Sequence, residues 1–184
     1  MTARPNLLIV HCHDLGQHLG CYGVSTVRTP NLDAFAAGGV RFAASFCTAP
    51  SCSPSRAALF TGRYPHNNGV MGLCHAYFAW DLHPEERHLA QILADAGYAT
   101  AAVGVIHETR SGPGRCGYQS YDPASRAREA TDAAIARLRS LAGERERPFL
   151  LYAGFVEPHR LPRPDSDPPG EHGFTTPYIA TDDA

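Results

Sequence analysis

The chain has 184 residues, of which 43% are hydrophobic and 18% charged, and its formal net charge at pH 7 is −2. This length and balance are typical of a soluble globular protein with one domain that can bury its own core. So weak a charge gives no reason to expect nucleic acid or an anionic membrane surface as a partner.

The segment 1–14, MTARPNLLIVHCHD, contains one short apolar run followed by histidine and aspartate. The run is too short for a signal peptide with a cleavage site and far too short to span a membrane. We therefore expect a cytoplasmic protein with no membrane anchor. Because no Cys-x-x-Cys spacing occurs, neither a zinc knuckle nor a redox pair is indicated, and most cysteines are expected to be free thiols: Cys12, Cys21, Cys47, Cys52, Cys74 and Cys116.

Apolar runs and amphipathic segments alternate along the chain. The runs predict buried strands at 6–12, 40–46, 98–105 and 148–155. Capping residues and spacing predict helices at 29–39, with Thr29 as N-cap, at 53–62, at 83–97, with Pro84 in the first turn, and at 124–142. The last helix should turn five side chains inward: Ala127, Ala134, Ile135, Leu138 and Leu141.

The alternation of strands and helices predicts an α/β fold, with a mainly parallel sheet sandwiched between helices. The Gly/Pro/Arg-rich segment 111–123 is expected to be a loop. Residues 160–184 have no periodic pattern and are expected to form an irregular tail. The chain seems to stop in the middle of a fold, so we expect a truncated domain.

Reactive side chains follow several predicted strands. His13 and Asp14 come after the first strand, His107 after the third, and Glu157 and His159 after the fourth. Ligands of open α/β sheets bind beyond the carboxyl ends of the strands. We therefore expect these groups to meet at one rim, together with Cys52 at the start of a helix.

Cys52 and Arg56 lie one helical turn apart. A helix N-terminus favours a reacting anion, and an arginine on the same side supplies donors to anionic oxygens. The alternative is a packed core cysteine with a surface arginine. Residue spacing alone leaves both interpretations open.

The string CSPSRAALFTGR, at 52–63, resembles the signature of the type I sulfatases, Cys-x-Pro-Ser-Arg followed by Leu-x-Thr-Gly-Arg. Three further segments resemble that family in the expected order: RPNLLIVHCHDLG, GYATAAVGVIHE and RPFLLYAGFVEPHRLP. The resemblance covers residues 4–164 and implies an alkaline-phosphatase-like fold. It also implies that residues 1–184 are the N-terminal part of a single catalytic domain.

The resemblance implies a role for four catalytic residues. A formylglycine-generating enzyme would oxidise Cys52 to formylglycine, the nucleophile that attacks sulfur. Arg56 would steady the converted side chain, and His107 would hydrogen-bond its hydroxyl and help to release sulfate. His159 would protonate the leaving group, while Arg63 would have a supporting electrostatic role.

The resemblance also implies a divalent metal, calcium in the family, bound by Asp14 and by residue 52 after conversion. His13 stands where the family has a first aspartate. Because calcium prefers hard oxygen ligands, a histidine there points to a softer metal or to no ligation by His13. Val105 replaces the family's substrate-binding lysine. The later Asp-Asn or Asp-His ligand pair has no counterpart, since EHG at 171–173 comes too early and follows a Pro-rich loop.

Several other histidines and acids have alternative interpretations. His11, His13 and His18 could form a transition-metal cluster, although ordinary structural roles are equally compatible with their spacing. His66 and His75 are expected on loops near the rim. Glu108 and Glu157 flank the implied catalytic histidines and could orient them or be structural.

The resemblance implies a hydrolase of sulfate esters or sulfamates, acting on a sulfated small molecule or glycan. One alternative is a phosphonate or phosphate ester hydrolase of the same superfamily. Another is an inactive truncated fragment that lacks the C-terminal metal ligands.

Overall fold

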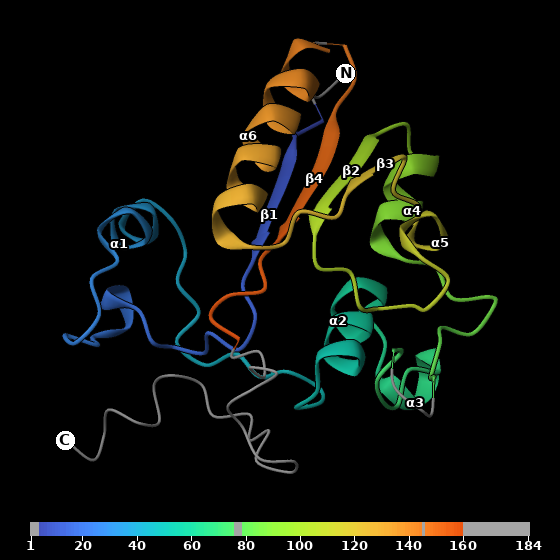
Figure 1. Cartoon of the computed structure of the whole chain (residues 1–184), viewed down its shortest axis with the longest axis horizontal. Coiled ribbons are helices and arrows are strands. Elements are labelled where there is room, and N and C mark those ends of the chain that lie inside the picture. The colour runs from blue at the N-terminus through green and yellow to red at the C-terminus, as the bar shows by residue number, and fades with distance from the viewer. Residues whose placement is uncertain (1–3, 76–78, 145, 160–184) are drawn as a thin grey trace, which may run out of the picture. The chain divides into compact units, whose positions relative to one another are not determined.

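The computed structural model describes residues 4–75, 79–144 and 146–159, whose elements are drawn in Figure 1. The chain divides into two compact units. The sheet unit comprises Met1–His13 and Cys47–Val156, and the α1 unit comprises Asp14–Phe46 and Glu157–Ala184. The predicted tail at 160–184, including the 171–173 segment, lies outside the described residues. No helix in the described part of the chain is long and apolar enough to cross a membrane.

The sheet unit is built on a four-stranded parallel sheet in the order β1-β4-β2-β3. Its strands are β1 (Leu7–His11), β2 (Ala99–Gly104), β3 (Ser120–Asp122) and β4 (Phe149–Gly154). His11 is paired with Gly154, and Gly154 with Gly104, so the carboxyl ends of three strands are level. This confirms the predicted α/β class and three of the predicted strands.

Helices cover both faces of this sheet (Figure 1). On one face, α6 (Ala127–Gly143) packs through Ala130 and Leu141 against the side chains of β2 and β4, including Leu151. On the other, α4 (Leu89–Asp95) and α2 (Cys52–Thr61) pack around Leu150 and Tyr152. Leu150 and Leu151 are completely buried and point to opposite faces, and each such side chain contributes about 1.5–3 kcal/mol of burial free energy.

The predicted helix at 83–97 begins later than expected, because Pro84 does not start it. The Arg115 guanidinium donates to the carbonyl oxygens of residues 83, 84 and 86 at 2.8–3.3 Å, so these oxygens are held by a side chain instead of a helical N–H. The helix begins at Leu89, where Nδ1 of the preceding His88 accepts the Ala90 N–H at 3.1 Å. Its N-cap is therefore a histidine.

For two side chains of α6, the prediction that they point inward is wrong. Ala127 and Ile135 are exposed, whereas Ala130, which was not predicted, is fully buried. The helical face that meets the sheet passes through Ala130, Ala134, Leu138 and Leu141. Ile135 lies about 100° around the helix from Ala134 and so faces solvent.

In the α1 unit, the predicted strand at 40–46 is wrong. These described residues form no strand, and the side chains of Val40, Phe42 and Phe46 are exposed. A β-like sequence becomes a strand only when a neighbouring strand pairs with its backbone. The predicted first helix is present as α1 (Pro30–Ala37), after the 3-10 turn η1 (Gly20–Tyr22).

Thr29 precedes α1, but its side chain does not cap it in the expected way. Its hydroxyl donates to Asp33 Oδ1 at 2.9 Å and accepts the Gly20 N–H at 2.8 Å, which ties η1 to the helix.

Besides η1, three short elements were not predicted. They are α3 (Pro65–Asn68), α5 (Pro113–Cys116) and β3, the last two within the predicted loop 111–123. Each has four residues or fewer, so none shows a periodic pattern.

Gly104 ends β2 at φ +88°, and a Cβ there would lie 1.9 Å from the Gly154 carbonyl oxygen on the adjacent strand. We predict that Gly104→Ala lowers the free energy of unfolding by at least about 3 kcal/mol, because a left-handed backbone and a backbone clash act together. Urea denaturation followed by circular dichroism measures the change. Gly143→Ala, where a Cβ meets nothing within 4 Å, should remain within about 1 kcal/mol of the wild type. Equal effects of the two substitutions would contradict the prediction.

Candidate active site

Cys52 is the first residue of α2. The preceding Ser51 is extended at φ −124° and ψ 148°, and Gly62 ends the helix in the left-handed region. Cys52 is partly exposed, whereas Ser53 and Arg56 are buried. The thiol therefore lies at the positive end of the helix dipole, which is a favourable place for an anionic group.

Arg56 is 3% exposed, and its guanidinium Nη1 lies among groups of three strands. It donates to the Tyr152 hydroxyl of β4 and to the Val105 carbonyl oxygen after β2, the latter at 3.3 Å. His11 Nδ1, at the end of β1, lies 3.4 Å away. A buried cation needs such partners because desolvation costs several kcal/mol per ion. Arg56 therefore fixes α2 to the carboxyl ends of three neighbouring strands.

The Tyr152 hydroxyl joins this network together. It donates to the Val105 carbonyl oxygen at 3.0 Å and lies 3.3 Å from His11 Nδ1. Burial, and to a smaller extent the nearby Arg56 charge, lower the pKa of His11 to about 4. His11 is thus a neutral imidazole near pH 7 and can sit beside a buried guanidinium.

His13, Cys52 and His107 form a second cluster next to Arg56. One ligand atom from each of the three residues lies within 4.8 Å of the other two. His13 is 7% exposed, and its ring centroid is 6.1 Å from that of His107. The His75 ring lies 4.8 Å from that of His107. The sheet unit thus brings together three of the predicted site residues.

Burial sets the protonation of this cluster. It raises the pKa of the Cys52 thiol, an effect that hydrogen bonding by Ser53 and the Arg56 charge oppose. Burial is also the main reason why the pKa of His107 is lowered to about 4. The charges of His75, Arg56 and His13 contribute to this lowering to a smaller extent. His107 is therefore neutral near pH 7 and able to accept a proton.

The side chain of Glu108 holds the backbone of His107 in place. Its carboxylate is fully buried, and Oε2 accepts the backbone N–H of His107 at 2.5 Å. Its Oε1 lies 3.8 Å from Nε2 of the equally buried His88. Since His88 Nδ1 accepts the Ala90 N–H, the His88 proton belongs on Nε2, facing the carboxylate.

The predicted residues Asp14 and His159 belong to the α1 unit. Nδ1 of His159 lies 2.5 Å from Oδ2 of Asp14, and both side chains are partly exposed. Asp14 has a left-handed backbone, with φ +51°. The carboxylate predicted to bind a metal thus contacts the histidine predicted to donate a proton.

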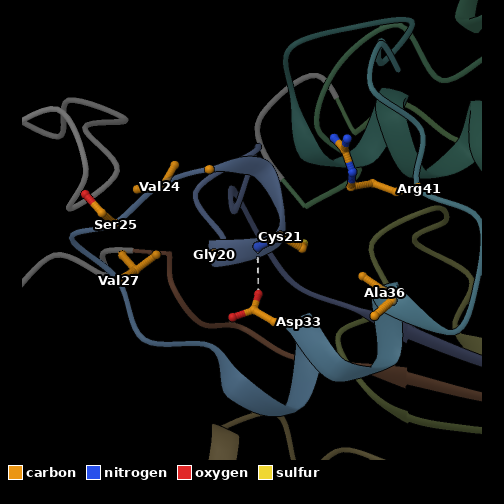
Figure 2. Close-up of a pocket in the computed structure, with 10 residues that line it drawn as sticks. Gly20, Cys21, Val24, Ser25, Val27, Asp33, Ala36 and Arg41 are labelled. Atoms are coloured by element: carbon orange, nitrogen blue, oxygen red, sulfur yellow. Dashed lines mark hydrogen bonds between the residues drawn. The ribbon is translucent and has the colours of Figure 1, made fainter.

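The α1 unit also holds a cavity of about 600 Å³ (Figure 2). Residues of segments 20–27 and 33–41 line it, and Asp33 accepts the Cys21 N–H at 2.7 Å beside it. None of the predicted catalytic residues lines this cavity.

Comparison with known proteins assigns the family, since residues 5–184 match the Sulfatase family. The chain belongs to the sulfatase family. It is 40% identical to human steryl-sulfatase over 113 residues, which are 58% of the chain and 19% of that protein. It is 35% identical to human N-sulphoglucosamine sulphohydrolase over 164 residues, 86% of the chain and 32% of that protein.

Solved sulfatase structures share the fold. A candidate sulfatase from Bacteroides thetaiotaomicron superposes with a TM-score of 0.72 at 25% identity, covering 90% of this chain and 40% of that one. A structure bound to its substrate, D-glucosamine-2-N,6-O-disulfate, gives 0.71 at 25% identity, covering 86% and 35%. The chain thus spans about a fifth to a third of these curated relatives and under half of these solved chains.

The sequence did not predict that His11 and Tyr152 contact Arg56. It indicated a metal-binding or ordinary structural role for His11, and for Tyr152 only a place in a buried strand. A hydroxyl inside an otherwise apolar strand was the available signal, because a buried tyrosine needs a partner. Of the other predicted residues, His66 is exposed and stacks on Tyr64, and Arg63 pairs with Glu86 at 3.1 Å.

Calcium does not suit the cluster in the sheet unit. Calcium takes six to eight oxygen ligands, whereas His13, Cys52 and His107 offer two nitrogens and a sulfur. Conversion of Cys52 to an aldehyde would replace the sulfur with oxygen but leave two imidazoles. These three residues therefore do not form a calcium site.

Removing the Tyr152 hydroxyl tests the Arg56 network. We predict that Tyr152→Phe lowers the free energy of unfolding by about 1.5–3 kcal/mol, because a buried charge loses a hydrogen bond. Tyr118→Phe is the matched control, since its buried hydroxyl has no hydrogen-bond partner among the described residues. That substitution should be neutral or stabilising in the same urea titration. A loss as large for Tyr118→Phe would contradict the assignment.

The lowered pKa of His11 predicts that the free energy of unfolding depends on pH. Its pKa is about 4 in the fold and 6.5 when exposed, so the unfolded chain binds more protons between these values. The free energy of unfolding should therefore be highest above pH 6.5 and fall as the pH is lowered toward 4. In EDTA-treated protein, His11→Gln should reduce this slope by up to about 1.4 kcal/mol per pH unit. The exposed His66→Gln should leave it unchanged, and an unchanged slope in His11→Gln would overturn the prediction.

Proposed function

We propose that the chain carries the nucleophile of a hydrolase that acts on sulfate esters or sulfamates. The nucleophile is residue 52, after a formylglycine-generating enzyme has oxidised Cys52 to formylglycine. The observation that carries this proposal is the location of Cys52 at a helix N-terminus, one turn from a buried Arg56 and beside His107. The CSPSR string and the membership of the sulfatase family support the same assignment.

Arg56 supplies a fixed positive charge beside the nucleophile. Because its guanidinium is buried and held by Tyr152 and Val105, it does not need to reorganise when negative charge develops on the sulfate oxygens. Preorganised charge in a water-poor site is often the largest single contribution to catalysis. The positive end of α2 acts in the same direction.

His107 moves a proton at residue 52. Its low pKa keeps it neutral near pH 7, so it can accept the proton that the nucleophile loses. The buried Glu108 carboxylate fixes the backbone that carries the imidazole. Formylglycine, when present, supplies as its hydrate a hydroxyl for attack and a second one through which sulfate leaves by elimination.

His159 is proposed as the donor of a proton to the departing oxygen or nitrogen. Its Nδ1 contacts the Asp14 carboxylate at 2.5 Å, so that transfer would come from Nε2. A carboxylate at Nδ1 orients a histidine and fixes which ring nitrogen is left for the substrate. This pairing supports an acid role within the α1 unit.

The proposed substrate is a sulfated small molecule or glycan. A relative at 35% identity is named N-sulphoglucosamine sulphohydrolase, and a solved neighbour binds glucosamine disulfate. We therefore propose N- or O-sulfated amino sugars as the first class to test. Val105, where the family has a lysine, leaves this position uncharged, and Arg56 is the nearby cation.

Conversion and turnover should be tested on the same preparation. After co-expression with a formylglycine-generating enzyme, mass spectrometry of the peptide containing Cys52 should show –CH2SH replaced by –CHO. The protein should then hydrolyse an aryl sulfate faster than an aryl phosphonate. Cys52→Ala should abolish this activity, and His107→Asn should lower kcat about 10²- to 10⁴-fold, as loss of a general acid–base group does.

Three results would contradict the proposal. They are an unmodified thiol after co-expression, unchanged activity in Cys52→Ala, and a preference for the phosphonate. The exposed His66→Asn is the control for His107→Asn and should keep wild-type kcat.

A further inference from the structure

Three ligand side chains of the sheet unit come from separately anchored segments. His13 lies two residues after β1, Cys52 begins α2, and His107 lies three residues after β2. One ligand atom from each lies within 4.8 Å of the other two. We propose that in the unconverted protein these residues bind a borderline-soft divalent transition ion of the Zn²⁺ class.

The chemistry of the ligand atoms selects the ion. Zinc is bound in proteins by cysteine sulfur and histidine nitrogen, with three protein ligands where one position stays open. Bond lengths of 2.0–2.3 Å place such ligand atoms roughly 3.3–3.6 Å apart. The three atoms need to close by at most about 1.5 Å from the upper limit of 4.8 Å, within reach of side-chain rotations.

The surroundings favour a bound cation. Nδ1 of His107 is buried and has no hydrogen-bond partner among the described residues, and an unmet buried nitrogen is costly unless an ion or water satisfies it. The buried Glu108 carboxylate holds the His107 backbone and adds negative charge close by. Arg56 opposes the cation, but its Nη1 is directed to Tyr152 and Val105.

Binding of the ion and conversion of Cys52 exclude each other. The ion forms a bond to the Cys52 sulfur as the thiol releases its proton to solvent, with no change of oxidation state. Conversion to formylglycine removes that sulfur. The zinc form is therefore a property of the unconverted chain, and this inference does not depend on the proposed hydrolysis.

Cobalt is the probe that reports each ligand. Full-length protein made without the converting enzyme and stripped with EDTA is titrated with Co²⁺. We expect a thiolate-to-cobalt charge-transfer band and the intense visible bands of four-coordinate cobalt. Zn²⁺ should abolish both bands, and Ca²⁺ in excess should leave them unchanged.

Variants identify the ligands. Cys52→Ser should remove the charge-transfer band. His13→Ala and His107→Ala should each weaken Co²⁺ binding at least about 100-fold, because even loss of an outer-shell partner costs 10- to 100-fold. Cys47→Ser and His66→Ala, which change exposed residues outside the cluster, should bind as the wild type does. Circular dichroism of each variant confirms that it is folded.

Three results would overturn the inference: no cobalt bands in the wild type, a charge-transfer band that persists in folded Cys52→Ser, or displacement of cobalt by calcium. None of these bears on sulfate hydrolysis by converted protein. Conversely, failure of the aryl sulfate assay would leave the metal-binding result intact.

Discussion

The buried guanidinium of Arg56 is the constraint on which the rest of the candidate site depends. A charge that is 3% exposed is stable only where its surroundings replace water, and Tyr152, Val105 and His11 do so from three strands. These partners can converge because the strands are parallel and in register to their last residues. The arginine thereby fixes α2, and with it Cys52, to the end of the sheet.

Close backbone approach at that end is the second requirement. Gly104 and Gly154 are paired neighbours, and a side chain on Gly104 would overlap the Gly154 carbonyl oxygen. That oxygen accepts the Val105 N–H at 2.9 Å, which turns the Val105 carbonyl toward Tyr152 and Arg56. The segment that follows β2 then places His107 next to Cys52 at the N-terminus of α2, and Glu108 accepts the backbone N–H of His107. Reactive groups from distant parts of the sequence meet because the backbone around them is tightly fixed.

Sequence reasoning predicted much of this fold from local patterns. Strands 6–12, 98–105 and 148–155 agree with β1, β2 and β4 to within one residue at each end, because each is an unbroken apolar run. Burial on both faces holds for β2 and β4, whereas Leu8 and Val10 of β1 are exposed, so the expectation of a fully buried first strand was wrong. The strand expected at 40–46 is absent, since pairing with a neighbour is not encoded locally. The start of α4 was misplaced because Arg115, from the short helix α5, holds the carbonyl oxygens near Pro84.

The sequence predicted those parts of the site that a short motif or the end of a strand marks. Cys52 and Arg56 were found from one motif, and His107 from its place after a strand. The partners of Arg56 were not, because the Arg56–Tyr152 contact joins residues 96 positions apart. A histidine at 13 argued against calcium, and the strand ends predicted that it meets Cys52 and His107 at one rim. The structure adds that one ligand atom from each lies within 4.8 Å of the other two.

A double-mutant cycle on Arg56 and Tyr152 tests the central claim most directly. The free energy of unfolding is measured for the wild type, Arg56→Met, Tyr152→Phe and the double variant. If the buried guanidinium fixes α2 to the sheet through this hydroxyl, the two losses should be coupled by at least about 1 kcal/mol. Losses that add to within about 0.5 kcal/mol would show that the pair does not hold the site together.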